Sequence, residues 1–160
     1  MDERLSFDEL WMGMCDLLGK RSPCLSRKAG VVIVRNNILL STGYNGPPRG
    51  IIHCDERTYE DKNVEEQTRQ GVCPRKAMGF KSGEGIEHCP AEHAERNAII
   101  NAKQDLEGAV LYLNQDAICV ECAKAIVQAG IKEIVMVGWV EYDIMTGRII
   151  RESGIRRREV

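Results

Sequence analysis

Two short fragments constrain this chain more than any other feature of its sequence. The first is His93-Ala94-Glu95, and the second is Cys119-Val120-Glu121-Cys122. Together they supply one imidazole, two thiols and a spare carboxylate. One imidazole and two thiols match a catalytic zinc site, which has three protein ligands and an exchangeable fourth position. A fold that uses them in this way has to bring the two fragments to one point.

The spacing of these residues favours metal binding. Cys119 and Cys122 are three residues apart, so they share one face at the start of a predicted helix over 119–129, where the helix dipole favours thiolates. His93 opens a second predicted helix, over 93–104, and Glu95 lies in its first turn. Either fragment alone is often accidental or structural, but the pair in this order favours a catalytic site.

The combination H-x-E with C-x-x-C is typical of zinc deaminases that act on nucleobases, although Ile118 stands where proline is usual. In the expected chemistry, zinc and Glu95 activate a water molecule. The water attacks the ring carbon that carries the exocyclic amine, and Glu95 moves protons to the ring nitrogen and to the leaving ammonia.

Composition limits the class of substrate. The 160 residues include 22 basic and 24 acidic side chains and only 5% aromatic residues, which argues against long nucleic acid and favours free nucleotides. The N-terminus MDERLSFDELW lacks the apolar core of a signal peptide, and no apolar run reaches the length of a membrane span. With an odd number of cysteines, seven, we expect a reducing, cytoplasmic setting without a membrane.

The order of the predicted elements indicates an α/β fold. Helices are expected over 6–20, 93–104, 119–129 and after Tyr142, and strands over 29–35, 38–44, 109–113 and 132–137, with a hairpin turn at Asn36-Asn37. We therefore predict one domain over 1–160, a three-layer sandwich with a central mixed β-sheet. Residues 46–90 form a long irregular insert that needs a function or a stabilising link. We expect the arginines at 156–158 to form a solvated tail.

Over nearly its whole length the chain resembles the dCMP deaminases of the cytidine deaminase superfamily. Four segments carry the resemblance: CLSRKAGVVIV at 24–34, TGYNGPPRG at 42–50 followed by HCDE at 53–56, HAERNAI at 93–99, and CVECAKAIVQAGIKEIV at 119–135. The resemblance implies a cytidine deaminase-like fold and hydrolysis of dCMP to dUMP, which feeds dTMP synthesis. It also implies that His93, Cys119 and Cys122 bind zinc and that Glu95 shuttles protons.

The resemblance implies further roles. Asn45 would bind the deoxyribose, the backbone of Ala94 would contact the pyrimidine, and Arg27 and Tyr142 would bind the 5′-phosphate. Many family members are hexamers that dCTP activates and dTTP inhibits, and a loop involved in that control corresponds here to Gly43, Tyr44, Gly46 and Arg49. From the residues alone, this loop is equally consistent with a simple turn after a strand, and Arg27 with a solvated charge.

A second metal site is a separate hypothesis. Cys54, Cys73 and Cys89 all lie in the insert, with His88 next to Cys89. Thiolates beside an imidazole suit a structural zinc, whose binding would order the insert. The alternative is that these cysteines are isolated and serve no common purpose.

Two other functions remain open from the sequence. The same chemistry could act on another substrate, such as a 5-substituted dCMP, dCTP, cytidine or an adenosine in transfer RNA; Asn97 and the GYNG segment argue against the last. The chain could also be a non-catalytic zinc module that binds a partner, in which case Glu95 would be dispensable.

Overall fold

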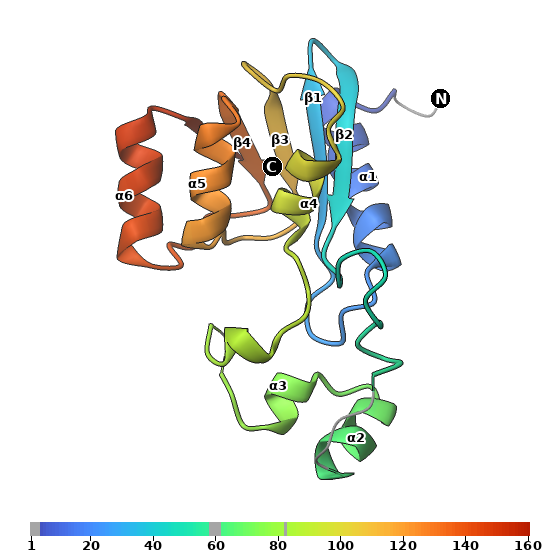
Figure 1. The fold of residues 1–160 in the computed structure, drawn as a ribbon. Helices are drawn as coiled ribbons and strands as arrows, with labels where there is room; N and C mark the ends of the chain where they lie inside the picture. Colours follow the sequence, from blue (N-terminus) through green and yellow to red (C-terminus); the bar gives the residue numbers. More distant parts are fainter. Residues whose placement is uncertain (1–3, 58–61, 82) are drawn as a thin grey trace.

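The framework is a five-stranded sheet with the strand order β2-β1-β3-β4-β5 (Figure 1). The computed structural model describes residues 4–57, 62–81 and 83–160. The strands are β1 (Gly30–Arg35), β2 (Ile38–Tyr44), β3 (Val110–Leu113), β4 (Glu133–Met136) and β5 (Arg156–Glu159). Strand β1 is antiparallel to β2 and β3, whereas β3, β4 and β5 run parallel. This is the mixed sheet that the sequence predicts.

Helices cover both faces of the sheet and make the predicted three layers. Helix α1 (Phe7–Arg21) lies on one face, and α4 (Ala94–Asn101), α5 (Val120–Gln128) and α6 (Ile144–Ser153) lie on the other (Figure 1). The β-branched run of β1 serves both cores, because neighbouring side chains of a strand point to opposite faces. Val32 packs with Trp11 of α1, while Val31 packs with Ala98 of α4 and Ile126 of α5.

Local signals in the sequence set several boundaries. Ser6 caps α1 in a capping box with Glu9, as its place before the acidic first turn predicts. Asn36 and Asn37 both have positive φ, 54° and 59°, which gives the tight turn between β1 and β2. Gly130, with φ 74°, follows α5 and allows the left-handed conformation beyond its C-terminal end.

The prediction of a solvated tail at 156–158 is wrong, because these residues lie in strand β5. Arg158 donates hydrogen bonds to both Glu133 of β4 and Asp8 of α1, and the side chain of Glu133 is only 4% exposed. Arg157 lies over the ring of Trp139, 4.8 Å from its centroid. The arginines therefore belong to the fold, and each has a partner that is distant in sequence.

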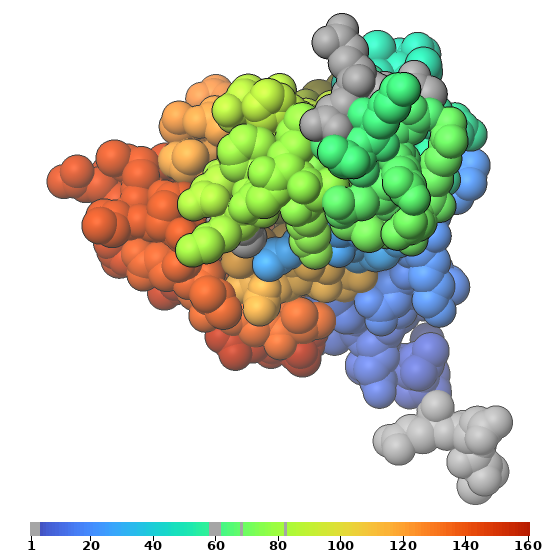
Figure 2. All heavy atoms as spheres, turned by 90° about the horizontal axis from the view of Figure 1, so that it is seen from below, coloured from blue at the N-terminus to red at the C-terminus, as the bar shows by residue number. Residues whose placement is uncertain are grey.

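The insert is more ordered than the sequence indicates. It contains two short helices, α2 (Lys62–Arg69) and α3 (Pro74–Ala77), and a 3₁₀ turn, η1 (Ile86–His88). Figure 1 shows these elements beyond one end of the sheet, and Figure 2 looks onto that end, where the insert (green) covers part of the core. In the described ranges, no helix has the length and apolar character needed to cross a membrane.

Candidate active site

The topology gathers the site residues at one edge of the sheet. Because β1 is antiparallel to both neighbours, β2, β3 and β4 end at the same edge. Asn45 follows β2, the segment that leads to Cys119 follows β3, and the segment that leads to Tyr142 follows β4. Open α/β sheets place ligand sites beyond the carboxyl ends of their strands.

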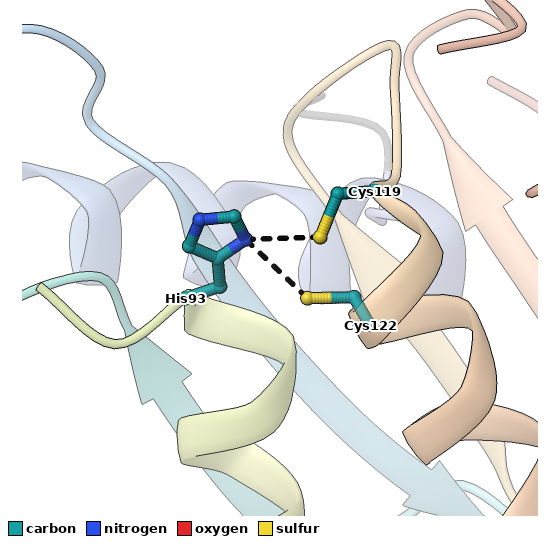
Figure 3. A group of neighbouring side chains, drawn as sticks. All are labelled: His93, Cys119 and Cys122. Atoms are coloured by element: carbon teal, nitrogen blue, oxygen red, sulfur yellow. Dashed lines mark hydrogen bonds between the residues drawn. The ribbon is translucent and has the colours of Figure 1, made fainter. Parts of the chain in front are cut away.

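His93, Cys119 and Cys122 converge at this edge (Figure 3). The Nδ1 atom of His93 lies 3.4 Å from the sulfur of Cys119 and 3.4 Å from that of Cys122. The three donor atoms all lie within 4.8 Å of one another, and no other group of three potential ligands meets this condition in the described ranges. A tetrahedral zinc ion bonded to sulfur and nitrogen holds them about 3.6 Å apart, so the observed separations fit zinc.

Two helix starts aim these ligands at one another. His93 is the N-cap of α4 and Cys119 is the N-cap of α5, and neither side chain caps its own helix. Cys122 lies one turn into α5 and is buried. The side chains are therefore free to face the gap between the two helices, and both helix dipoles stabilise negative charge there.

The protonation of the three groups is coupled. A hydrogen bond from Cys122 lowers the pKa of Cys119 to about 4, and the same bond, together with burial, raises the pKa of Cys122. The hydrogen bond to Cys119 also raises the pKa of His93. Zinc takes deprotonated thiolates, so its binding replaces the shared protons. His93, Cys119 and Cys122 are the zinc ligands of this chain, as the sequence predicts.

Glu95 lies directly beside these ligands. It is the second residue of α4 and is 5% exposed. Burial raises the pKa of its carboxyl group, and the group also interacts with the Cys122 thiol. Glu95, His93 and Cys119 line one cavity of about 360 Å³. A carboxyl group in this place can exchange protons with a molecule held in the cavity.

All four residues that the resemblance assigns to the substrate line this cavity: Arg27, Asn45, Ala94 and Tyr142. Asn45 is 8% exposed, and its side-chain amide already accepts a hydrogen bond from the backbone of Ala29 and donates one to the carbonyl of Arg27. Each amide atom keeps one further hydrogen-bonding position. Asn45 thus fixes the segment that carries Arg27 and still reaches the cavity.

The cavity also has walls that sequence reasoning missed. Gln115 follows β3, and its amide donates to the carbonyls of Lys28 and Asn114. The insert adds Phe80 and three basic side chains, Arg75, Lys76 and Lys81. No local pattern distinguishes these residues from the other charges of the insert, because only the packing of the insert against the core brings them to the site.

Gly43 and Tyr44 are the last two residues of β2, which spans the strand expected over 38–44, so the loop that follows begins at Asn45. Gly46 pairs with Glu92, the residue before His93, in an antiparallel β-bridge in which each backbone N–H donates to the carbonyl of the other residue. Only Arg49 of this group is on an exposed segment, where it reaches Asn101 of α4.

Three cysteines lie near Cys54: Cys24 of the core, and Cys73 and Cys89 of the insert. Burial and, to a smaller extent, these neighbours raise the pKa of Cys54 to about 11. Their sulfurs do not form a group as tight as the zinc ligands in the described ranges. The ring of His88 stacks on Phe80, with the ring centroids 5.4 Å apart.

Comparison with known proteins agrees with this site. The family model "Cytidine and deoxycytidylate deaminase zinc-binding region" matches residues 5–138. The chain is 35% identical over 158 residues to a deoxycytidylate deaminase of Schizosaccharomyces pombe, and the alignment covers 98% of this chain and 44% of that relative. It is 32% identical over 138 residues to a deoxycytidylate deaminase of Mycobacterium phage D29, which covers 82% of this chain and 94% of that protein.

The chain spans less than half the length of the relatives from S. pombe and Saccharomyces cerevisiae, 44% and 45%. The crystal structure of a dCMP deaminase from the cyanophage S-TIM5 in complex with dCMP and dUMP has the same fold. Its TM-score is 0.70 at 22% identity, with 99% of this chain and 100% of that chain covered. Because the zinc ligands are in place and the family model matches most of this chain, the chain belongs to the cytidine and deoxycytidylate deaminase family.

Proposed function

We propose that this protein hydrolyses dCMP to dUMP and ammonia and so supplies dUMP for dTMP synthesis. The observation that carries the proposal is a buried carboxyl group, Glu95, beside a three-ligand zinc site in a cavity of nucleotide size. Deaminases of nucleobases need this combination of a metal and a separate carboxyl group. The relatives named deoxycytidylate deaminase support the choice of substrate.

The chain supplies the proton chemistry through Glu95. Zinc, when bound, would lower the pKa of a water molecule so that it can attack C4 of cytosine. Glu95 is placed to receive one proton of that water and deliver it to the ring nitrogen N3, and then to receive the proton of the new C4 hydroxyl and deliver it to the leaving amine. One carboxyl group can serve all of these transfers because it lies in the same helical turn as His93.

The other cavity residues are proposed to hold the nucleotide. The buried Asn45 amide would bond the deoxyribose hydroxyl with its remaining positions, and the backbone of Ala94 would contact the pyrimidine beside Glu95. Arg27 and Tyr142 would contact the 5′-phosphate. Support comes from the cavity, which all four residues line.

Ammonia release tests this function directly. The zinc-loaded protein should deaminate dCMP faster than CMP, dCTP, deoxycytidine or 5-methyl-dCMP. A preference for one of the other cytosine compounds would keep the chemistry but change the substrate. Activity on none of them, with zinc bound, would favour the non-catalytic zinc module.

Regulation and assembly are proposed on the resemblance. We infer a hexamer that responds to dCTP and dTTP, with Gly43, Tyr44, Gly46 and Arg49 near the effector site. We also infer a cytoplasmic setting, which the seven free cysteines support. Light scattering and dCMP kinetics with and without each effector would test assembly and control. A monomer whose rate ignores both nucleotides would contradict them.

We also retain the second structural zinc as a proposal, on Cys54, Cys73 and Cys89. The proximity of Cys24 to Cys54 supports a four-cysteine site with Cys24 in place of His88. Metal analysis of protein purified with zinc tests whether this second site exists. Two zinc ions per chain, falling to one in Cys54→Ser, are expected. One zinc per chain in the wild-type protein would exclude the second site.

A further inference from the structure

The cavity has an uneven distribution of charge. Among the described residues that line it, Glu95 is the only carboxylate, whereas four side chains are basic: Arg27, Arg75, Lys76 and Lys81. Glu95 lies beside the zinc ligands, where the base reacts. Three of the four cations come from the insert: Arg75 and Lys76 lie in α3, and Lys81 lies between α3 and η1. The charge that an anionic substrate would meet is therefore supplied mainly by the insert.

We propose that the insert reads the phosphate of the nucleotide through the ammonium groups of Lys76 and Lys81 and so makes the enzyme selective for nucleotides over nucleosides. This inference rests on the proposed function. The insert would then bind the phosphate together with the core residues Arg27 and Tyr142.

Hydrogen bonds within the insert fix the turn that carries Lys81. The Lys81 N–H donates to a side-chain oxygen of Glu84 at 2.9 Å, and the Glu84 N–H donates to the Lys81 carbonyl at 3.1 Å. The guanidinium of Arg75 donates to the carbonyls of Glu84 and Lys81, at 2.8 and 3.2 Å. Arg75 is thus a positioning residue, because it clamps the turn and holds Lys81 at the cavity.

The same turn approaches the core beside Tyr142, one of the residues proposed to contact the phosphate. Gly83 has a φ of 86°, and a β-carbon built on it would lie 2.8 Å from the hydroxyl of Tyr142. Only glycine fits this approach without a shift. The turn therefore brings Lys81 to the side of the cavity where Tyr142 lies.

The two lysine side chains are available for a ligand. In the part of the chain that the structure describes, neither Lys76 nor Lys81 forms a salt bridge. An ammonium group is a compact cation that binds phosphate well, and such charge-assisted hydrogen bonds are stronger than neutral ones. The insert contributes this charge while the zinc ligands and Glu95 handle the base.

The test compares Lys81→Ala and Lys76→Ala with Lys62→Ala as the matched control. Lys62 is an exposed lysine of the same insert that does not line the cavity. We expect each cavity variant to lose about 10- to 100-fold in kcat/KM for dCMP, with little change for deoxycytidine and none for Lys62→Ala. Parallel assays with dCTP show whether a monophosphate or a triphosphate meets these lysines.

Arg75→Lys tests the clamp separately. It keeps the positive charge but loses the two-carbonyl geometry of the guanidinium. As a positioning effect, it should raise KM for dCMP towards the value of Lys81→Ala and leave kcat at saturation unchanged. A variant that lowers kcat and leaves KM unchanged would contradict this role.

Binding separates this inference from the proposed function. Calorimetry with zinc-loaded Glu95→Gln protein measures the affinity for dCMP and for deoxycytidine without turnover. Tighter binding of dCMP that is lost in Glu95→Gln/Lys81→Ala supports the inference even if the wild-type protein shows no deamination. If dCMP binds or reacts equally well with and without the two lysines, the insert does not read the phosphate.

Discussion

Gly43→Ala tests how closely the sheet must approach the helix that carries His93. Gly43 lies in β2, directly under α4. A β-carbon at this position would lie 2.4 Å from the carbonyl oxygen of Ala94 and 2.5 Å from the nitrogen of Ala98. Both atoms belong to the backbone of α4, so no side-chain rotation can relieve the contact.

The size of the effect follows from these distances. Ordinary contacts of a β-carbon begin at 3.4 Å, so α4 has to retreat by about 1 Å. Overpacking of this kind costs about 1–3 kcal/mol. The same retreat moves His93, whereas zinc–ligand distances vary by only about 0.2 Å. We therefore expect Gly43→Ala to lower both the free energy of unfolding and the affinity for zinc.

Urea unfolding and a zinc competition titration measure the two effects. With a slope of about 2 kcal/mol/M, the urea midpoint of the zinc-loaded variant should fall by about 0.5–1.5 M. Gly13→Ala is the matched control, because it lies in α1 and nothing is within 4 Å of an added β-carbon. That control should be more stable than wild type by about 0.5–1 kcal/mol, since alanine favours a helix over glycine.

An unchanged urea midpoint and unchanged zinc affinity in Gly43→Ala would refute this reasoning. Gly43 would then not be required for packing, and a role in effector control would be its remaining explanation. If stability falls but the zinc affinity stays the same, the contact is real but α4 adjusts without moving His93.

Three further predictions concern separate parts of the molecule. Glu95→Ala should keep its zinc and lose about 100- to 10,000-fold in kcat, as measured by ammonia release; wild-type turnover would contradict the mechanism. A hydrogen bond from Arg158 lowers the pKa of Asp8. Burial acts to raise the pKa of Glu133, but hydrogen bonds that include one from Arg158 outweigh burial, and the pKa of Glu133 is lowered as well. Both carboxylates therefore stabilise the fold above about pH 5, and this contribution is lost as the pH falls through their lowered pKa values. Arg158→Ala should lower the melting temperature at pH 7, and the melting temperature of the variant should fall less than that of the wild type between about pH 5 and pH 3. If the melting temperatures of the two proteins fall equally over this pH range, these carboxylates are not the groups that titrate. Ser6→Ala removes the capping box of α1 and should cost about 1 kcal/mol in urea unfolding, whereas an unchanged midpoint would mean that the cap contributes nothing.

Local sequence signals predicted the parts of the fold that depend on near neighbours. The cap at Ser6, the turn at Asn36-Asn37 and the end of α5 before Gly130 each depend on a few consecutive residues. Periodicity gave the four core strands in the right order because their apolar side chains must be buried.

Strand β5 escaped prediction because its sequence is polar. Arg156 and Arg158 are neutralised by Glu133, and Asp8 contributes from the first helix of the chain. These partners lie far away in sequence, so a run of arginines gives no local sign of a strand. The helices of the insert were missed because they are short, with eight residues in α2 and four in α3, and helical periodicity is recognised only over a longer window.

The sequence by itself determined the reactive chemistry of this protein: an imidazole, two thiols and a carboxyl group at helix starts, with spacings that zinc can use. Those residue types and short spacings act within a turn or two of chain, so they can be read without a fold. Only the tertiary structure decided which other residues face the zinc site. The edge where β2, β3 and β4 end gathers Asn45, Gln115 and Tyr142, and the insert adds Lys76 and Lys81. Their proximity depends on chain crossings and packing over long sequence separations, which no local pattern records.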